Sequence, residues 1–492
     1  MYFIGYDIGS SSVKAALLNA DTGIRVASAT SPEKEMAIEV PHPDWAEQQP
    51  ENWWKEVVNA TAMLLSKYPV DPAQIKGIGI AYQMHGLVCV DKDQQVLRPA
   101  IIWCDSRAVE IGNKAFRELG EDYCLSNLLN SPGNFTASKL RWIKENEPAV
   151  YERIHKVMLP GDYIAMKLTG EACTTVSGLS EGTFWNFSKK EVDKALLANY
   201  GIDESLLSAI VPTFGVQGYL TPAAAALLKL APGTPVTYRA GDQPNNAFSL
   251  NVLNPGEAAT TAGTSGVVYA VHDKNDFDPQ SRVNTFVHVN NDAGQTRNGV
   301  LMCLNGTGIA NSWLKNMVGD ITYPEMNDLA ATAPIGAGGL QVYPFGNGAE
   351  RILENKTLGA QVKNLDFNRH NRASMMRAVQ EGIVFGLNYG VEIMTRMNLK
   401  IQRVRAGNAN MFLSPLFRQA FANTANVVIE LYNTDGAQGA ARGAAIGAGY
   451  VKETEAFKGM ECLSVIEPET SIHQQYQEVY ENWVTGLRNQ LR

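Results

Sequence analysis

The chain has 492 residues and a formal net charge of −8, and a chain of this length exceeds what one hydrophobic core usually serves, so two domains are expected. Hydrophobic residues make up 45% and charged residues 19%, which is typical of a globular protein. The acidic balance argues against nucleic acid or an anionic membrane as a partner, although it leaves room for a small anionic ligand.

The N-terminus and the cysteines favour a cytoplasmic location. MYFIGYDIGSSS has no basic segment before an apolar one, and no apolar run in the chain reaches membrane-spanning length, so we expect neither a signal peptide nor a membrane anchor. The six cysteines are scattered without a CxxC pair. This pattern indicates reduced thiols rather than a disulfide framework or a zinc site.

The first half predicts a sheet followed by helices. Residues 2–8, 13–19 and 24–30 have the pattern of three consecutive strands, and 50–68 that of a helix with Pro50 in its first turn. Two further strand runs, 75–83 and 86–91, are separated by Met84 and His85. The pattern from about 105 to 205 is mostly helical.

The second half opens in the same way as the first. Residues 256–271 are two strand runs joined by a Gly-Thr-Ser-Gly turn, which matches the strand, glycine, hydroxyl and strand order of residues 6–18. Because the two hairpins lie about half a chain apart, a duplicated domain with a cleft between the copies is one interpretation; two unrelated hairpins are the other. A helix over 372–397 and a strand over 401–408 follow.

Gly439, Gly443 and Gly447 lie four residues apart near the C-terminus. Such spacing places them on one face of a helix. We expect this face to pack closely against another backbone rather than to form a membrane dimer, because Arg442 interrupts a short segment.

Both hairpin turns have the chemistry of a phosphate site. Glycine and hydroxyl residues can direct N–H and O–H groups at a phosphate without bulk, and Asp7 precedes the first turn as a hard oxygen ligand suited to Mg²⁺. The chain has no GxxxxGK[ST] or GxGxxG segment. The candidate phosphate residues are Ser10, Ser11, Ser12, Lys14, Thr264 and Ser265.

The stretch AGDQPNNAF (240–248) shows no helical or strand period and predicts a turn. Its aspartate, Asp242, has two interpretations from the residues alone. It is either ordinary turn chemistry or a functional carboxylate.

Several motifs in order resemble the FGGY family of carbohydrate kinases. They are YDIGSSSVKAALLN (6–19), WAEQQPENWW (45–54), GIAYQMHG (79–86), LRPAIIWCDSR (97–107), FTASKLRWI (135–143), AGDQ (240–243), AGTSG (262–266) and the late glycine-rich segment. The resemblance covers the chain to about residue 450. It implies an α/β fold of duplicated ribonuclease-H-like domains, of the actin and hexokinase type, flanking a central cleft.

The resemblance also implies that the two domains bind different ligands. Residues 1–244 would form an N-terminal sugar-binding domain, and residues 245–492 a C-terminal nucleotide-binding domain. ATP and Mg²⁺ would be the cofactors, sugar and ATP the small-molecule partners, and a homodimer is possible.

Asp242 would be the catalytic base in such a kinase. It would accept the proton of a sugar hydroxyl as that oxygen attacks the γ-phosphorus of ATP. A carboxylate near its normal pKa would suffice, because the proton leaves late, and no second paired carboxylate is required. The implied sugar-binding residues are Met84, His85, Trp103, Asp105 and Gln243.

The implied nucleotide residues are Gly306, Gly407 and Asn410. Relatives often carry three glycines and an alanine where this chain has Ala406, Gly407, Asn408 and Ala409. A second departure lies at 347–367, where Glu350 and Arg351 are kept but a proline and a phenylalanine pattern is lost.

Within the family the chain is most similar to the xylulokinases, which implies phosphorylation of D-xylulose to D-xylulose 5-phosphate in xylose metabolism. Two alternatives remain at this point. One is a family kinase for another ketose or polyol, such as ribulose, fuculose or glycerol. The other is a non-catalytic actin-fold nucleotide sensor, which would have no need of a base at Asp242.

Overall fold

A computed structural model describes residues 1–491, and the chain divides into two compact units. The first unit comprises Met1–Asn251, Phe286–Asn298 and Thr434–Met460. The second comprises Val252–Thr285, Gly299–Asn433 and the chain from Glu461 onward. Each unit is therefore built from segments that are distant in the sequence.

The first unit is built on a six-stranded sheet in the order β13-β14-β5-β1-β2-β3. Strands β1, β2 and β3 form an antiparallel meander, and β5 and β14 continue from β1 in parallel. The strands are β1 (Tyr2–Ile8), β2 (Val13–Asn19), β3 (Ile24–Ser31), β5 (Ile75–Tyr82), β13 (Phe214–Tyr219) and β14 (Pro235–Gly241). The predicted meander, and the strand before Met84, are confirmed.

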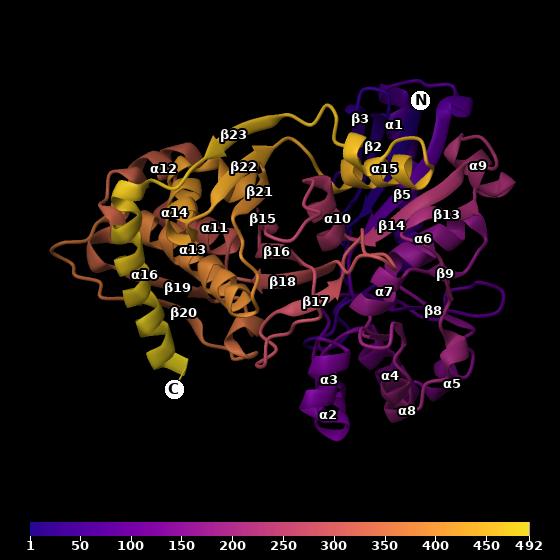
Figure 1. Cartoon of the computed structure of the whole chain (residues 1–492), viewed down its shortest axis with the longest axis horizontal. Coiled ribbons are helices and arrows are strands. Elements are labelled where there is room, and N and C mark those ends of the chain that lie inside the picture. Colours follow the sequence, from indigo (N-terminus) through magenta and orange to yellow (C-terminus); the bar gives the residue numbers. More distant parts are fainter. Residues whose placement is uncertain (492) are drawn as a thin grey trace. The chain divides into compact units, whose positions relative to one another are not determined.

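The two faces of this sheet bury different kinds of residue. Ile4, Tyr6 and Ile8 alternate along β1 and join a hydrophobic core with helices α1 (Pro50–Lys67) and α6 (Pro160–Thr169). Gly5 lies on the opposite face, where a Cβ atom would stand 1.9 Å from the carbonyl oxygen of Ala437 in helix α15. Glycine there allows the α15 backbone to lie directly on the sheet, as Figure 1 shows for the yellow helix over β5.

Helix α15 (Gly436–Gly447) confirms the predicted close packing. A Cβ atom on Gly443 would lie 2.5 Å from the ring of Tyr238, and one on Gly447 would lie 1.8 Å from the carbonyl oxygen of Thr237. The glycine face thus meets strand β14.

Residues 242–249 form a helix, so the predicted turn is wrong. Helix α10 (Asp242–Ser249) begins directly after β14, with Gly241 as its N-cap. Aspartate in the first turn suits the positive end of a helix, and Pro244 is tolerated there because the first N–H groups of a helix have no partner within it.

The remaining elements of the first unit are short: β4 (Glu47–Gln48), β6 (Val88–Val90), β7 (Ala100–Ile101), α2 (Val109–Leu119), α3 (Glu121–Asn127), α4 (Thr136–Asn146), α5 (Pro148–Tyr151), β8 (Lys156–Met158), β9 (Cys173–Thr174), α7 (Val176–Glu181), β10 (Trp185–Asn186), β11 (Glu191–Val192), α8 (Lys194–Tyr200), β12 (Ala209–Ile210) and α9 (Pro222–Leu228).

The sheet of the second unit repeats the order of the first. Its strands run β18-β16-β15-β21-β22-β23, with an antiparallel β15–β16 hairpin and with β21 and β22 parallel to β15. The hairpin takes the place that β1 and β2 hold in the first unit. The duplicated ribonuclease-H-like architecture is therefore confirmed. The strands are β15 (Glu257–Ala262), β16 (Gly266–His272), β18 (Asn298–Leu304), β21 (Arg403–Gly407), β22 (Val428–Tyr432) and β23 (Cys462–Ile466), while β17 (Asn284–Val287) marks the passage of the chain from one unit to the other.

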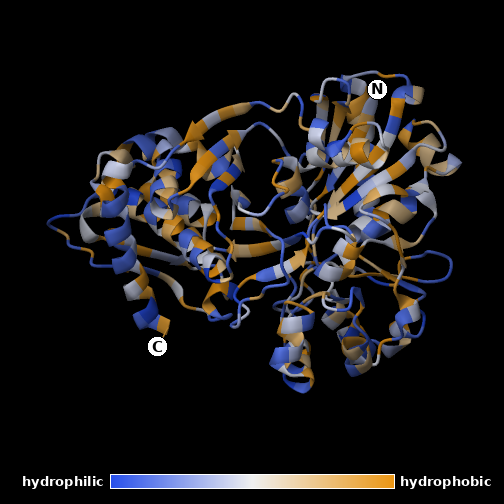
Figure 2. Ribbon diagram, in the orientation of Figure 1, coloured by the Kyte–Doolittle hydropathy of each residue, from blue (hydrophilic) through white to orange (hydrophobic). Residues whose placement is uncertain are grey.

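A long buried helix forms the core of the second unit. Helix α13 (Arg372–Arg396) is buried around most of its circumference and packs on α14 (Pro415–Ala425) and on the hairpin of β19 (Gln341–Phe345) and β20 (Gly359–Lys363). Figure 2 shows α16 (Thr470–Leu491), nearest the C-terminus, alternating hydrophilic and hydrophobic residues, as expected of a helix with one buried face. Helices α11 (Gly308–Val318) and α12 (Tyr323–Ala331) complete the unit. No helix within residues 1–491 combines the length and the hydrophobicity needed to cross a bilayer.

Candidate active site

The turn between β1 and β2 places hydroxyl groups beside a carboxylate. The turn closes through a hydrogen bond from the Gly9 N–H to the carbonyl oxygen of Ser12 (3.0 Å), and Ser10 and Ser11 lie within it. Asp7 lies opposite Lys14 in the strand register. A Cβ atom on Gly436 would come within 2.5 Å of Asp7 Oδ2 and 3.3 Å of Asn246 Oδ1. The Asp7 carboxylate oxygen and the Asn246 amide oxygen, both hard ligands, therefore both lie close to Gly436, where a side chain would not fit.

Asp242 lies at the end of β14, close enough to Asp7 for the two charges to interact. Burial first, and then the charge of Asp7, raise the pKa of Asp242 to about 7, against the opposing effect of hydrogen bonds from Gln243. Burial also raises the pKa of Asp7, with Asp435 adding to the shift and Lys14 opposing it. The pKa of Asp242 thus departs from its normal value, and the sequence could not show this because three strands bring the two carboxylates together.

Met84 and His85 follow β5 at the same edge of the sheet. Met84 is buried, and His85 adopts a left-handed backbone conformation with φ 61°. The His85 Nδ1 lies 2.9 Å from the main-chain oxygen of Glu181, and its ring packs on Phe135 and Phe286 with centroid distances of 4.8 and 5.2 Å. Because a carbonyl oxygen can only accept, Nδ1 carries a proton.

Trp103 and Asp105 have very different surroundings. Trp103 is 51% exposed, with its Nε1 3.5 Å from Ser10 Oγ. Asp105 has no exposed surface, forms an ion pair with Arg107 (2.7 Å) and accepts a hydrogen bond from the Ala46 N–H (2.6 Å). The Asp105 carboxylate is thus engaged by the protein itself.

Glu181 and Lys139 were both missed as site residues from the sequence. Glu181 is 1% exposed, and a Cβ atom on Gly241, the N-cap of α10, would lie 2.4 Å from its Oε2. Burial and then the charges of Asp242 and Asp162 raise the pKa of Glu181 well above its usual range. Nothing in the local pattern SGLSEGTF indicates this proximity. Lys139 stands within the FTASKLRWI motif, which was the only available signal.

A large cavity of the second unit lies beside the turn between β15 and β16. It measures about 620 Å³, and the predicted residues Thr264 and Asn410 line it, together with α11, α12 and the segment that follows β21. Asn410 has φ 54°, and a Cβ atom on Gly263 would lie 3.5 Å from its Nδ2. Ile309, Pro324 and Pro415 give the cavity an apolar wall.

Gly306 and Gly407 lie outside the lining of this cavity. A Cβ atom on Gly306 would stand 1.4 Å from the carbonyl oxygen of Pro344, so the glycine is required by close backbone packing. Gly407 ends β21. Glu350, kept from the family motif, has no exposed surface and accepts from the Asn305 N–H (3.0 Å), and burial raises its pKa to about 7.

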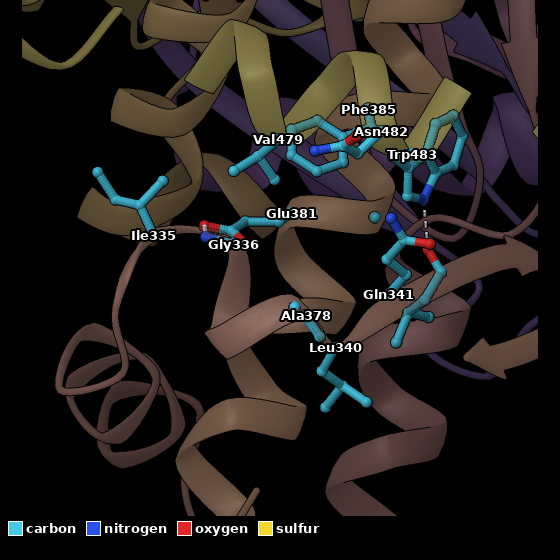
Figure 3. Close-up of a pocket in the computed structure, with 13 residues that line it drawn as sticks. Ile335, Gly336, Leu340, Gln341, Ala378, Glu381, Phe385, Val479, Asn482 and Trp483 are labelled. Carbon is cyan, nitrogen blue, oxygen red and sulfur yellow. Dashed lines mark hydrogen bonds between the residues drawn. The ribbon is translucent and has the colours of Figure 1, made fainter. Parts of the chain in front are cut away.

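A smaller cavity of the second unit lies between α13, α16 and β19 and measures about 130 Å³. Figure 3 shows Phe385, Val479 and Trp483 on one side of it. The indole N–H of Trp483 donates to the Val342 carbonyl oxygen (2.8 Å). The only carboxylate in its wall, that of Glu381, pairs with Arg377 (2.7 Å). With its charge paired, the cavity has the character of an imperfectly filled core.

Two sheets of the same order, each with a glycine and hydroxyl turn at the same hairpin, define the class of proteins with a duplicated ribonuclease-H-like fold. The N-terminal domain of the FGGY family of carbohydrate kinases matches residues 2–249, and the C-terminal domain of that family matches residues 258–451. The chain belongs to the FGGY family of carbohydrate kinases. It is a sugar kinase, and ATP is the phosphoryl donor that this family implies.

Among known proteins, a xylulose kinase of Klebsiella pneumoniae is 32% identical over 450 residues, covering 90% of this chain and 88% of the relative. An L-xylulose/3-keto-L-gulonate kinase of Escherichia coli is 30% identical and covers 98% of this chain and 96% of the relative. The crystal structure of a "xyloylose kinase" from Brucella ovis superimposes with a TM-score of 0.89 at 27% identity, over 99% of this chain and 98% of that one.

Proposed function

We propose that this kinase phosphorylates D-xylulose at its terminal O5 hydroxyl with ATP, giving D-xylulose 5-phosphate and ADP. The observation that carries the proposal is the Asp242 carboxylate at the edge where β5 and β14 end, near Asp7 and with its pKa raised to about 7. A general base works best when its pKa lies near the working pH. A protein that only senses a nucleotide would have no use for such a group.

In the proposed reaction Asp242 accepts the O5 proton as O5 attacks the γ-phosphorus and ADP leaves. The proton then passes from Asp242 to solvent. Phosphoryl transfer depends mainly on positioning and on charge stabilisation, so the turn hydroxyls of Ser10, Ser11, Ser12 and Thr264, together with Lys14, would hold phosphate oxygens. Gly306, Gly407 and Asn410 would shape the part of the site that binds the nucleotide. The adenine ring would lie in the cavity of the second unit.

The donor set at Asp7 is suited to Mg²⁺. Mg²⁺ prefers oxygen ligands and usually keeps several waters. The Asp7 carboxylate and the Asn246 amide oxygen supply such ligands at the Gly436 approach. When bound there, Mg²⁺ would neutralise phosphate charge.

The sugar would contact Met84, His85, Trp103 and Gln243. Met84 offers an apolar surface to the sugar's C–H groups, and His85 a ring nitrogen to a hydroxyl. Because its oxygens are engaged by Arg107 and Ala46, we propose that Asp105 positions the loop of Trp103 rather than touching the sugar. The first unit is thus proposed to bind sugar and the second to bind nucleotide.

A comparison of kcat/KM for D-xylulose, L-xylulose, D-ribulose, L-fuculose, 3-keto-L-gulonate and glycerol tests the proposal. D-xylulose should be preferred by at least about tenfold, or about 1.4 kcal/mol of transition-state free energy. A second candidate is a kinase of L-xylulose or a keto-gulonate, favoured by the 30% identical relative of that name. A tenfold preference for any other sugar would assign the chain to that sugar instead.

A further inference from the structure

A fully buried lysine lies under the two loops that we propose to hold the sugar. Lys139, on α4, has no exposed surface. Its Nζ donates to the main-chain oxygens of His85 and Ile102, both at 2.9 Å. The first carbonyl belongs to the loop after β5, and the second belongs to Ile102, which directly precedes Trp103 in the sequence. The Lys139 ammonium group therefore connects the His85 loop and the Trp103 loop, which are separate in the sequence.

The charge of this lysine is costly for the fold. Lysine is almost never fully buried unless it is paired, because its ammonium group loses hydration. Burial lowers the pKa of Lys139 to about 8, and the nearby charge of Asp105 only partly opposes this effect. A methionine would fill similar space without that cost, so stability alone does not explain the residue.

The contact with His85 falls where the backbone is strained. A left-handed conformation is unfavourable for a residue other than glycine and persists only where the surroundings fix it. The contacts that fix His85 include hydrogen bonds on both its main chain and its ring: Lys139 donates to its carbonyl oxygen, and the Glu181 carbonyl oxygen accepts from its Nδ1. Lys139 thus acts on the orientation of a ring that we propose to meet a sugar hydroxyl.

The second loop is held in a similar way. Asp105, two residues after Trp103, is fixed by Arg107, which also pairs with Glu47 at 2.7 Å. The carbonyl oxygen of Ile102, on the other side of Trp103, is fixed by Lys139. The half-exposed Trp103 therefore lies between two anchored points.

We propose that Lys139 is a positioning residue that sets the affinity for the sugar by locking the His85 and Trp103 loops together, an inference that rests on the proposed function. Lys139 itself does not touch the reacting atoms. Its protonated form makes the stronger hydrogen bonds to the two carbonyl oxygens, because charge-assisted bonds are about twice as strong as neutral ones. Sugar affinity should therefore depend on its charge.

The variant Lys139→Met tests this role, with Lys139→Gln as a variant that keeps N–H donors without the charge. For Lys139→Met we expect KM for D-xylulose, and the dissociation constant from calorimetry, to rise about tenfold or more, since two hydrogen bonds to a charged donor are lost. The kcat should change by less than about threefold, and KM for ATP should not change. Lys139→Gln should lie between. The matched control is Lys144→Met, the same change on the same helix but with the side chain directed to Gly201.

The pH dependence of the KM for the sugar distinguishes a role of the Lys139 charge from a role in packing alone. In the wild type, KM for the sugar should rise as pH increases from 7 to 9, because Lys139 loses its proton in this range, and Lys139→Met should show no such rise. The other ionisable groups facing Lys139 are His85, Cys104, Asp105 and Arg107. Burial raises the pKa of the Cys104 thiol above its ordinary value, and all of these groups remain in Lys139→Met, so a rise that disappears in that variant belongs to Lys139.

The sugar panel with the wild type is measured first, and the variants are then assayed on the best sugar. If no sugar is phosphorylated, the proposed function fails, and the sugar-binding role of Lys139 fails with it. If the wild type is active while Lys139→Met keeps the wild-type KM for the sugar, the proposal for Lys139 alone is overturned. Equal losses toward sugar and ATP with a lower Tm would also overturn it in favour of a scaffold role. If Lys139→Met does not fold, the KM for the sugar of Lys139→Gln and its dependence on pH in the wild type test the proposal instead. A wild-type KM in Lys139→Gln with no rise between pH 7 and 9 in the wild type would overturn it.

Discussion

Asp242 combines two properties: it opens a helix, and it is partly buried near a second carboxylate, that of Asp7. The N-terminus of a helix stabilises a negative charge, whereas burial and Asp7 disfavour it. Burial and the charge of Asp7 outweigh the helix N-terminus, so the pKa of Asp242 is raised to about 7. The carboxylate can therefore take up and release a proton at neutral pH.

Replacing Asp242 by asparagine should abolish the transfer step while sparing binding. The amide has the same shape but cannot accept the proton, and loss of a general base typically costs about 10²- to 10⁴-fold in rate. Calorimetry should still detect ATP and sugar. Asp203→Asn, the same change at an exposed cap of a short helix, should keep full activity. An Asp242→Asn enzyme with a tenth of the wild-type kcat would show that another group is the base.

The activity should fall as the pH is lowered through about 7. The base must be unprotonated to act, and burial together with the charge of Asp7 raises the pKa of Asp242 to about 7. Mg²⁺ bound at Asp7 would offset the second effect, while burial would still hold the pKa above its ordinary value. The wild-type kcat/KM for the sugar should therefore drop about tenfold for each pH unit well below that value. A profile that stays flat down to pH 5 would contradict the pKa assigned to Asp242.

Asp7→Ala should weaken Mg²⁺ dependence more than sugar binding. The substitution removes a carboxylate oxygen from the proposed site, and cations of this kind are held by few carboxylates. We expect a higher Mg²⁺ concentration at half-maximal activity and weaker Mn²⁺ binding in the presence of ADP, followed by electron paramagnetic resonance. Unchanged Mn²⁺ binding would remove Asp7 from the metal site.

At the scale of elements, α15 shows how glycine brings a helix onto a sheet. Gly5 and Gly79 on adjacent parallel strands meet carbonyl oxygens of Ala437 and Ala440, and Gly447 on the helix meets the strand in return. The approach positions Gly436, at the start of the helix, against Asp7. The same packing that stabilises the first unit therefore shapes the candidate metal site.

Gly447→Ala should destabilise the protein strongly. Its methyl group would lie 1.8 Å from the Thr237 oxygen and 2.8 Å from the Gly215 nitrogen, both main-chain atoms that cannot rotate away. Overpacking typically costs about 1–3 kcal/mol, and more where the backbone must move. Urea unfolding measures the loss, with Ala448→Ser on the adjacent exposed position as the control. Equal midpoints for the two variants would show that α15 can shift away from the sheet.

At the scale of the whole molecule, the first unit is discontinuous in sequence. Thr434–Met460 returns to it after the chain has built most of the second unit. Without that segment, Gly5 and Gly79 would expose a bare sheet face that α15 covers. We therefore expect that the N-terminal half does not fold independently.

A fragment of residues 1–251 should fail to fold cooperatively. It lacks α15 and the segment Phe286–Asn298, both parts of the first unit. We expect low solubility or a broad, non-cooperative thermal transition by circular dichroism, against a sharp one for the full chain. A sharp transition for the fragment, near the Tm of the full chain, would show that α15 is dispensable.

The sequence by itself determined the features that depend on local order along the chain. The two strand, glycine, hydroxyl and strand hairpins, the helix over 372–396 and the glycine face of α15 all follow from period and composition, because these act between residues a few positions apart. The motifs, met in order, identified the family. Around Asp242 local reasoning failed, since AGDQPNNAF lacks a helical period and yet begins a helix after β14.

The tertiary structure decided which of these residues share one environment. Asp7, Glu181 and Asp242 lie far apart in the sequence, and only the parallel pairing of β1, β5 and β14, with α7 packed nearby, brings their charges within range of one another. Lys139 likewise gained its two carbonyl partners from loops that precede it by dozens of residues. Burial and charge are properties of the surroundings, so the raised pKa of Asp242 and the lowered pKa of Lys139 could arise only once the chain had folded.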